Sequence, residues 1–242
     1  MSVAKPIMAY RRTERETARL AARYEAIVEA ARALASESGL GAVQVVPVAE
    51  RAGIAAGTVY RYFPSKDDLV AAVVNATAER EVAAIRAAAA AAPGALSGLA
   101  AAIVAFAAGT MRMRRLAFAM LAEAPPPYPP PLAAEGREGA GRLSFRRDIA
   151  GEFESLIRAA IAAGQLPDQP PAAMAAAVIG ATVESLVGPF APTLAGPEAE
   201  RAAVQDITLF ALRALGVVDA RARGLVVSVI SNQVSGSKSF DP

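Results

Sequence analysis

Residues 44–69, QVVPVAERAGIAAGTVYRYFPSKDDL, predict two short helices joined by a tight turn and followed by the start of a third. Gly53 supplies the residue with positive φ that a sharp reversal of the chain needs. Pro64 disfavours helical backbone at Phe63 and so ends the second helix. Ser65, with Asp68 three residues later, forms a capping-box-like start for the third. The stretch therefore predicts a helix-turn-helix.

The second helix of this pair, residues 56–63, spans about two turns at ~3.6 residues per turn. Val59 and Phe63 share one face, which leaves the other face free to touch a partner. Four of its side chains can donate hydrogen bonds: Thr58, Tyr60, Arg61 and Tyr62. A DNA major groove admits a helix and presents acceptors to such donors, so this face suits duplex DNA. Lys66, in the first turn of the next helix, is placed to hold a phosphate.

The segments AERAG, GTVYRYF and PSKDDL, at these spacings, resemble the DNA-binding signature of the TetR/AcrR family of bacterial transcriptional regulators. The resemblance is strong over residues 27–69. It is weaker in RRLAFAMLAEAP, LSFRRDIAGEF and VIGATVESLVGPF of the second half. It implies an all-α fold, with an N-terminal three-helix helix-turn-helix DNA-binding domain and a larger helical ligand-binding and dimerisation domain.

By the same resemblance, the chain is expected to be a homodimer that binds a double-stranded DNA operator, palindromic to suit two-fold symmetry, and leaves it when an apolar small molecule binds. No enzymatic activity, cofactor or metal is implied. The residues expected to contact DNA are Gln44, Arg51, Ala56, Gly57, Thr58, Tyr60, Arg61, Tyr62 and Lys66. A helical ligand cavity and a four-helix dimer interface belong to the same expectation.

Two departures from the family pattern keep an alternative open. Ala55 stands where a serine or threonine is common, and Ala56 stands where a lysine is common. These changes remove a helix cap and a phosphate contact. The chain could then be a small-molecule-binding helical protein whose head binds DNA without specificity. A third hypothesis, an enzyme using Asp148 and Glu152, has little support, because one helical turn separates the two on what is usually a solvated face.

Composition and charge agree with an anionic partner. The chain of 242 residues is 54% hydrophobic and contains no cysteine and no histidine, so disulfides, thiolate chemistry and the usual metal ligands are absent. Residues 1–66 carry ten Lys or Arg against six Glu. Five of these arginines, Arg11, Arg12, Arg15, Arg19 and Arg23, could lie against DNA phosphates, although a solvated helix face is the commoner role.

No secretory signal is recognised at the start of the chain, and cytoplasm is the expected location. Residues 87–111 hold no charge and are long enough to span a bilayer. Pro93-Gly94 and Ser97-Gly98 interrupt them, however, so two buried helical segments and no membrane contact are expected. Thr13 with Glu16 is the expected start of the first helix, with an apolar face at Leu20, Tyr24, Ile27, Ala31 and Leu34.

Four parts of the chain are expected: residues 1–12 as a flexible basic arm, 13–68 as the DNA-binding domain, 69–216 as the effector-binding and dimerisation domain, and 217–242 as a tail. The proline-rich run Pro125–Pro131 and the glycines 136, 139 and 141 predict a loop. In the tail, residues 225–230 are β-branched and apolar. The tail is expected either to pack on the body or to be mobile.

The second half also contains candidate binding residues at helical spacing. The expected effector-binding set is Phe106, Met113, Met120, Glu123, Phe145, Arg146, Phe153, Met174, Val178 and Thr182. A pocket of this composition favours a sizeable apolar ligand with a few polar contacts. The expected dimer-interface set is Val183, Leu186, Val187, Val204, Ile207, Phe210 and Ala211.

Overall fold

The structure, a computed structural model, describes residues 7–122 and 137–237, with side chains described for residues 15–121 and 145–230. Over these residues the chain forms helices and no strand, so the all-α prediction is confirmed. The helices are α1 (Ile7–Ser38), α2 (Val45–Arg51), α3 (Ala56–Tyr62), α4 (Lys66–Ala90), α5 (Ala95–Arg112), α6 (Arg114–Ala117), α7 (Arg137–Ala162), α8 (Pro171–Leu186), α9 (Gly196–Ala214) and α10 (Asp219–Ser237).

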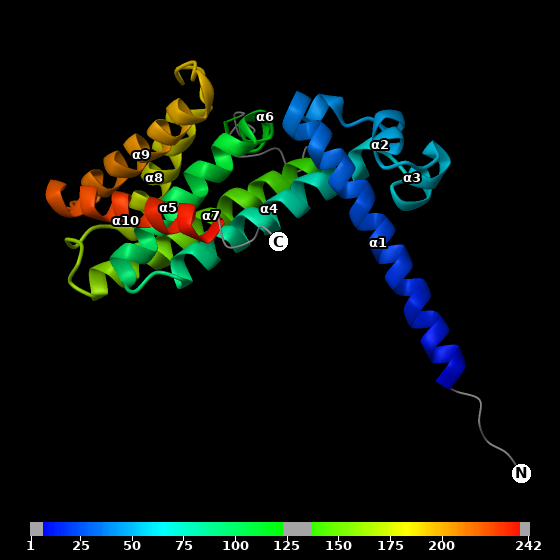
Figure 1. Ribbon diagram of the computed structural model, residues 1–242, viewed down its shortest axis with the longest axis horizontal. Helices are drawn as coiled ribbons and strands as arrows, with labels where there is room; N and C mark the ends of the chain where they lie inside the picture. The colour runs from blue at the N-terminus through cyan, green and yellow to red at the C-terminus, as the bar shows by residue number, and fades with distance from the viewer. Residues whose placement is uncertain (1–6, 123–136, 238–242) are drawn as a thin grey trace, which may run out of the picture.

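The helices divide into a small N-terminal head and a larger body (Figure 1). The head contains α2, α3 and the C-terminal half of α1, and α4 runs from it into the body. In the body, α5 packs against α4, α7, α8, α9 and α10. The predicted division between residues 68 and 69 falls within α4 and stays a prediction.

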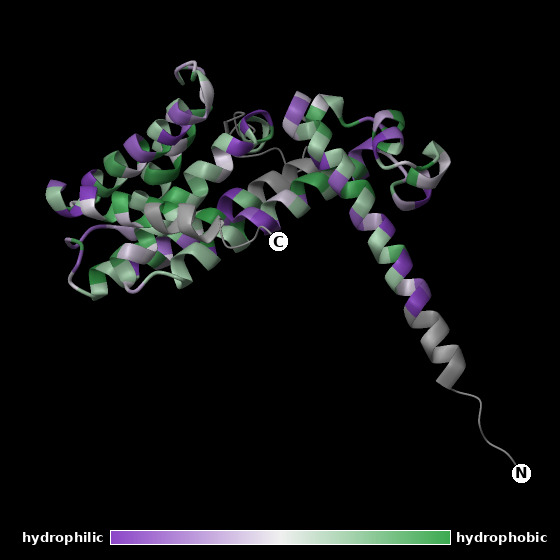
Figure 2. Ribbon diagram, viewed as in Figure 1, coloured by the Kyte–Doolittle hydropathy of each residue, from purple (hydrophilic) through white to green (hydrophobic). Residues whose placement is uncertain are grey.

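Helix α5 is the centre of the body because small apolar residues cover most of its surface. Thirteen of its residues are buried, among them Leu99, Ile103 and Phe106. It is long and apolar enough to cross a membrane by length and composition, but 72% of that window is buried inside the protein. The uncharged stretch thus consists of the end of α4, a turn and α5, as predicted. Figure 2 shows the contrast with α1, whose projecting part mixes hydrophilic and hydrophobic residues.

Two local predictions about helix boundaries were wrong, at the starts of α1 and α7. Helix α1 begins at Ile7 and not at Thr13, because residues 7–12 continue the helix and do not form a separate arm there. Helix α5 runs through Met111 to Arg112, and the chain breaks at Met113 (φ −125°, ψ 44°) before α6 and a π-turn at Phe118–Ala122. Helix α7 begins at Arg137, so Gly139 and Gly141 lie in a helix, where each glycine costs only about 1 kcal/mol.

Two further expectations concern the first helix and the tail. Leu20 and Tyr24 are 43% and 38% exposed, so the apolar face of α1 is buried only from Ile27 onward. The tail forms α10, which packs on α5 and α9 and buries Ala222, Val226 and Val229. Packing on the body is therefore the arrangement seen for residues 219–230. The proline run at residues 125–131 and Gly136 lie outside the described residues.

Ion pairs of Glu29 join the head to α4. Its carboxylate accepts hydrogen bonds from Arg32 of α1 at 2.6 Å and from Arg80 of α4 at 2.5 Å. These bonds, Arg32 first, lower the pKa of Glu29 from 4.5 to about 2. Glu29 and Arg80 are about half exposed, with 48% and 47% of their side-chain area in solvent.

Stability should therefore depend on pH through Glu29. Because the pKa of Glu29 is depressed in the folded state, its contribution to the free energy of unfolding is complete above pH ~4.5 and is lost as the pH falls toward ~2. Solvent screening limits the expected contribution to about 1 kcal/mol or less. In thermal unfolding between pH 7 and pH 2, the melting temperature of Glu29→Gln should fall less with acidification than that of the wild type. Parallel curves would contradict this role.

Candidate nucleic-acid interface and ligand cavity

The turn between α2 and α3 is closed by backbone hydrogen bonds around Gly53. The Ile54 N–H donates to the Ala49 carbonyl at 3.0 Å, and the Gly53 N–H donates to the Glu50 carbonyl at 3.1 Å. This pair of bonds is a Schellman motif, which places its C′ residue in the left-handed region. Gly53 has φ of 65°, and a Cβ there would meet no atom within 4 Å. Glycine is thus needed for its conformation and not for space.

Helix α3 is fixed to the head by one face. Val59 is fully buried and Phe63 is 3% exposed. The Phe63 ring contacts that of Tyr24 with centroids 5.1 Å apart, which joins the end of α3 to α1. Ser65 caps α4: its hydroxyl accepts from the Asp68 N–H at 3.1 Å. These contacts set the direction of the outward face of α3.

The outward face carries the residues predicted to contact DNA. Tyr60 is 55% exposed. Gly57, Arg61 and Lys66 are also exposed, whereas Ala56, Thr58 and Tyr62 are half-buried. No ion-pair partner is seen for Arg61 or Lys66 among the described residues. Four of these seven residues are therefore exposed and accessible to a partner, and three are half-buried.

Two predicted DNA contacts lie at α2. Gln44 is exposed and does not cap the helix with its side chain, which donates instead to the Gly41 carbonyl at 3.4 Å. Arg51 is exposed but donates to the Glu37 carboxylate of α1 at 2.7 Å. A phosphate would have to compete with Glu37 for Arg51, whereas Gln44 has no such competitor.

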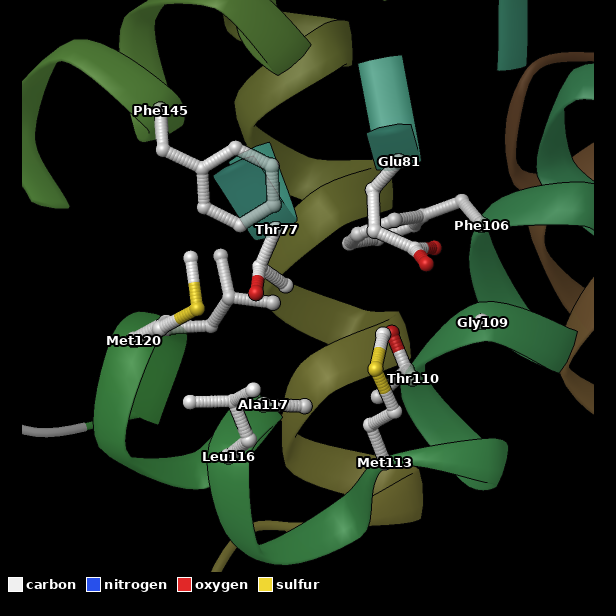
Figure 3. A pocket seen from close by; sticks show the side chains of 11 residues that line it. Thr77, Glu81, Phe106, Gly109, Thr110, Met113, Leu116, Ala117, Met120 and Phe145 are labelled. Atoms are coloured by element: carbon white, nitrogen blue, oxygen red, sulfur yellow. The ribbon is translucent and has the colours of Figure 1, made fainter. Parts of the chain in front are cut away.

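A small cavity lies between α4, α5, α6, the π-turn and the start of α7. Its walls include four of the predicted effector residues, Phe106, Met113, Met120 and Phe145, together with Thr77, Glu81, Gly109, Thr110, Leu116, Ala117 and Leu121 (Figure 3). It leaves about 20 Å³ for the centre of a water molecule. That is room for one small polar group.

The other predicted effector residues lie away from this cavity. Phe153 is fully buried and packs edge-on against Phe106, with centroids 5.7 Å apart. Val178 and Thr182 are buried on α8, where the Thr182 hydroxyl donates to the Val178 carbonyl at 2.8 Å. Met174 and Arg146 are half-buried. Glu123 lies outside the described residues.

The predicted dimer-interface residues mostly pack inside the chain. Val183, Leu186, Val187, Val204, Ile207 and Ala211 are buried, and only Phe210 is exposed, at 55%. The exposed side of α8 and α9 carries other residues. An open groove there is lined by Ser185, Leu186, Phe190, Pro192, Leu194, Ala199, Ala202, Ala203, Asp206, Ile207 and Phe210. Phe190 is 89% exposed beside it.

Known proteins match the head by sequence and most of the chain by fold. The family described as bacterial regulatory proteins, tetR family, matches residues 27–73. The head therefore matches the DNA-binding region of that family. The HTH-type transcriptional repressor KstR of Mycolicibacterium smegmatis is 48% identical over 58 residues, and that of Rhodococcus jostii is 50% identical over 58 residues.

These sequence matches are confined to the head. They cover 24% of this chain and only 28% and 27% of the two KstR proteins. The fold match is broader. FadR, a fatty acid degradation regulator from Bacillus halodurans, has a TM-score of 0.62 at 19% identity, covering 81% of this chain and 97% of that one. AibR in complex with isovaleryl coenzyme A and operator DNA has a TM-score of 0.59 at 14% identity, covering 78% and 97%.

Two glycines of the head should respond differently to alanine. Gly53→Ala places a Cβ in the left-handed region and should cost about 1–2 kcal/mol of unfolding free energy. Gly57→Ala is the matched control, because Gly57 has no positive φ and its Cβ would meet no atom within 4 Å. Helix propensity should then leave its stability unchanged or up to about 1 kcal/mol higher. Equal losses in urea unfolding would contradict the assigned turn.

Proposed function

We propose that this chain is a DNA-binding transcriptional repressor that acts as a homodimer and releases its operator when an apolar small molecule binds. The observation that carries the proposal is the outward face of α3, where Tyr60 and Arg61 are exposed while Val59 and Phe63 anchor the helix. Such a face can enter a major groove. The role is non-enzymatic and cytoplasmic, and the operator is palindromic double-stranded DNA.

Named relatives support this function. KstR is named a transcriptional repressor, and its similarity to this chain falls on the DNA-binding head. The AibR structure holds both operator DNA and isovaleryl coenzyme A, and a RolR structure with a TM-score of 0.56 holds resorcinol. Those ligands belong to those proteins. They support a small-molecule effector here without identifying it.

We place the dimer contact on the exposed side of α8 and α9. Most of the residues predicted for the dimer interface pack inside the chain, while Phe190 and Phe210 present apolar surface to a partner. Large exposed aromatic residues beside a groove are typical of an interaction site. A two-fold axis at this face would present two α3 helices to successive major grooves.

Helix α4 is the element through which an effector could act on the heads. Ser65 caps the start of this helix in the head, and its residues Thr77 and Glu81 line the cavity in the body. A ligand that binds better to one position of α4 shifts the population toward that position. The distance between the heads would then no longer match the operator.

Arg61 provides the first test of the DNA interface. Arg61→Ala removes a donor to DNA and should weaken binding to operator fragments selected from genomic DNA by ~1–3 kcal/mol, or at least about fivefold. Gel shift and size exclusion measure affinity and dimerisation. Arg221→Ala, an exposed arginine on α10, is the matched control.

The dimer should persist in both variants, and only Arg61→Ala should lose affinity. Undiminished binding would remove Arg61 from the interface. If the wild type bound selected and random DNA equally, the head would be a non-specific DNA binder, and the proposed repressor function would fail.

The projecting part of α1 is a second candidate DNA contact. Every residue from Arg15 to Ala26 is exposed, and this segment extends from the same end of the molecule as α3 (Figure 1). Arg15, Arg19 and Arg23 recur every four residues and so share a face. None of the three has an ion-pair partner among the described residues. We propose that this row binds phosphates beside the operator.

Salt dependence tests the row. Each phosphate contact contributes about 0.9 to the slope of log affinity against log salt concentration. Replacing Arg15, Arg19 and Arg23 together by Gln should reduce that slope by up to about 2.7, measured by fluorescence anisotropy. The control variant replaces Arg158, Arg201 and Arg221, exposed arginines of the body, by Gln. It loses the same three positive charges. If both triple variants shift the slope equally, net charge and not contact explains the effect.

A further inference from the structure

The cavity between α4 and α5 is apolar except at one end. Thr77 of α4 is 3% exposed, and its hydroxyl is the one buried side-chain oxygen or nitrogen without a hydrogen-bond partner in the part of the chain that the structure describes. A buried hydroxyl left without a partner is costly, and native proteins rarely keep one. The other buried threonines with a recorded bond, Thr182 and Thr208, donate to carbonyls of their own helices. Thr77 is therefore exceptional.

Glu81 lies one turn after Thr77 on the same face of α4. Figure 3 shows its carboxylate pointing toward Gly109 and Thr110 of α5. A Cβ at Gly109 would lie 2.0 Å from a carboxylate oxygen of Glu81, so only glycine at residue 109 admits this position. Arg112 donates to the other oxygen at 3.2 Å from the solvent side, where 64% of its side chain is exposed.

We propose that Thr77 and Glu81 bind the hydroxyl group of a small aromatic alcohol, a phenol, whose ring occupies the apolar part of this cavity. The inference rests on the proposed function, because it assigns an effector class to that regulator. A hydroxyl both donates and accepts a hydrogen bond. It can donate to the Glu81 carboxylate and accept from the Thr77 hydroxyl, which satisfies both groups at once.

Other head groups fit less well. A carboxylate would be repelled by Glu81, since like charges in a poorly solvated site oppose each other. An ammonium only donates and would leave the donor of Thr77 unused. A hydrocarbon would leave the Thr77 hydroxyl unpaired. A site with buried hydrogen-bonding groups discriminates strongly against analogues that lack the matching group.

The apolar walls favour a ring. Phe106 and Phe145 offer aromatic faces and edges, and Met113 and Met120 bring sulfur beside them. The present space holds only one small polar group, so a ring must displace part of the wall. Methionine has flexible side-chain bonds and adapts to such changes. Met113 also lies at the break between α5 and α6.

A ligand at this site would act directly on α4. The bond between Glu81 and Arg112 ties α4 to α5, and a phenol hydroxyl that binds Glu81 competes with Arg112. Two of the groups that hold the ligand therefore lie on the helix that carries the DNA-binding head.

The test is isothermal titration of the full chain, without DNA, with 4-ethylphenol, ethylbenzene and 4-ethylbenzoate. The phenol should bind at least about tenfold more tightly than ethylbenzene, as expected for a hydrogen bond to a charged group, and the benzoate should not bind. Equal binding of phenol and hydrocarbon, binding of the benzoate, or no binding of the phenol would overturn the proposal.

Variants separate recognition from packing. Thr77→Val should remove most of the preference for the phenol over ethylbenzene, whereas Thr208→Val, a buried threonine outside the cavity, should keep it. Glu81→Gln removes the repelling charge and should let 4-ethylbenzoate bind. Gly109→Ala displaces the Glu81 carboxylate and should reduce phenol affinity. An unchanged ligand preference in Thr77→Val and Glu81→Gln would overturn the assignment.

A gel shift with added 4-ethylphenol then tests the regulator itself. Release of DNA supports both proposals. If titration shows that the phenol binds while the DNA complex persists, the proposed phenol site is supported and the proposed release of DNA on ligand binding is contradicted. If the wild type binds no specific DNA, the repressor function fails, and the titration still decides the site.

Discussion

The position of α4 is the constraint on which the rest of the molecule depends. This helix of 25 residues spans about 37 Å at ~1.5 Å per residue, and both of its halves carry residues buried in hydrophobic core. Leu69, Val70 and Val73 belong to the head end, while Val82 and Ile85 face the body. Because one rigid helix belongs to both cores, a shift of its body end must also move the head. This couples the two parts mechanically, although coupling in function needs a ligand that discriminates between two positions.

The body is organised to hold that helix closely. α5 is rich in alanine and glycine, and at Gly98 a Cβ would lie 3.1 Å from the Ala89 carbonyl at the end of α4. Farther along, Gly109 admits the Glu81 carboxylate. Small residues at both places let the backbones of α4 and α5 approach each other. The same composition makes α5 resemble a membrane span by hydropathy, whereas its burial by α7, α8, α9 and α10 shows a core helix.

The sequence predicts the head well because its signals are local. Gly53 specifies the turn, Pro64 ends α3, and Ser65 caps α4 within a few residues of one another. The cavity could not be predicted in this way. Phe106 and Phe153 have the same spacing signals, yet one lines the cavity and the other only packs behind it, because that difference depends on how α5 and α7 meet. No local pattern in the sequence distinguishes Glu81 from an ordinary solvated charge, and only the structure shows its approach to Gly109.

The proposed dimer face shows the same limit. Helical spacing identified the apolar rows of α8 and α9, but an apolar row can face its own chain or a partner. Val183 and Ile207 face inward, while Phe210 and Phe190 remain exposed. The sequence alone does not distinguish a row that faces its own chain from one that faces a partner, because both require hydrophobic side chains.

The distribution of ion pairs favours the proposed binding of DNA by the head. In the body, Arg86, Arg112 and Arg158 are bonded to carboxylates, so their charge is largely balanced locally. At the head, Arg61 and Lys66 have no such partner among the described residues, and neither has the row on α1. A phosphate can bind these groups without breaking an existing ion pair. Arg51 differs, because DNA would have to displace Glu37. Basic side chains without an ion-pair partner among the described residues thus lie at the end of the molecule where α3 presents its outward face.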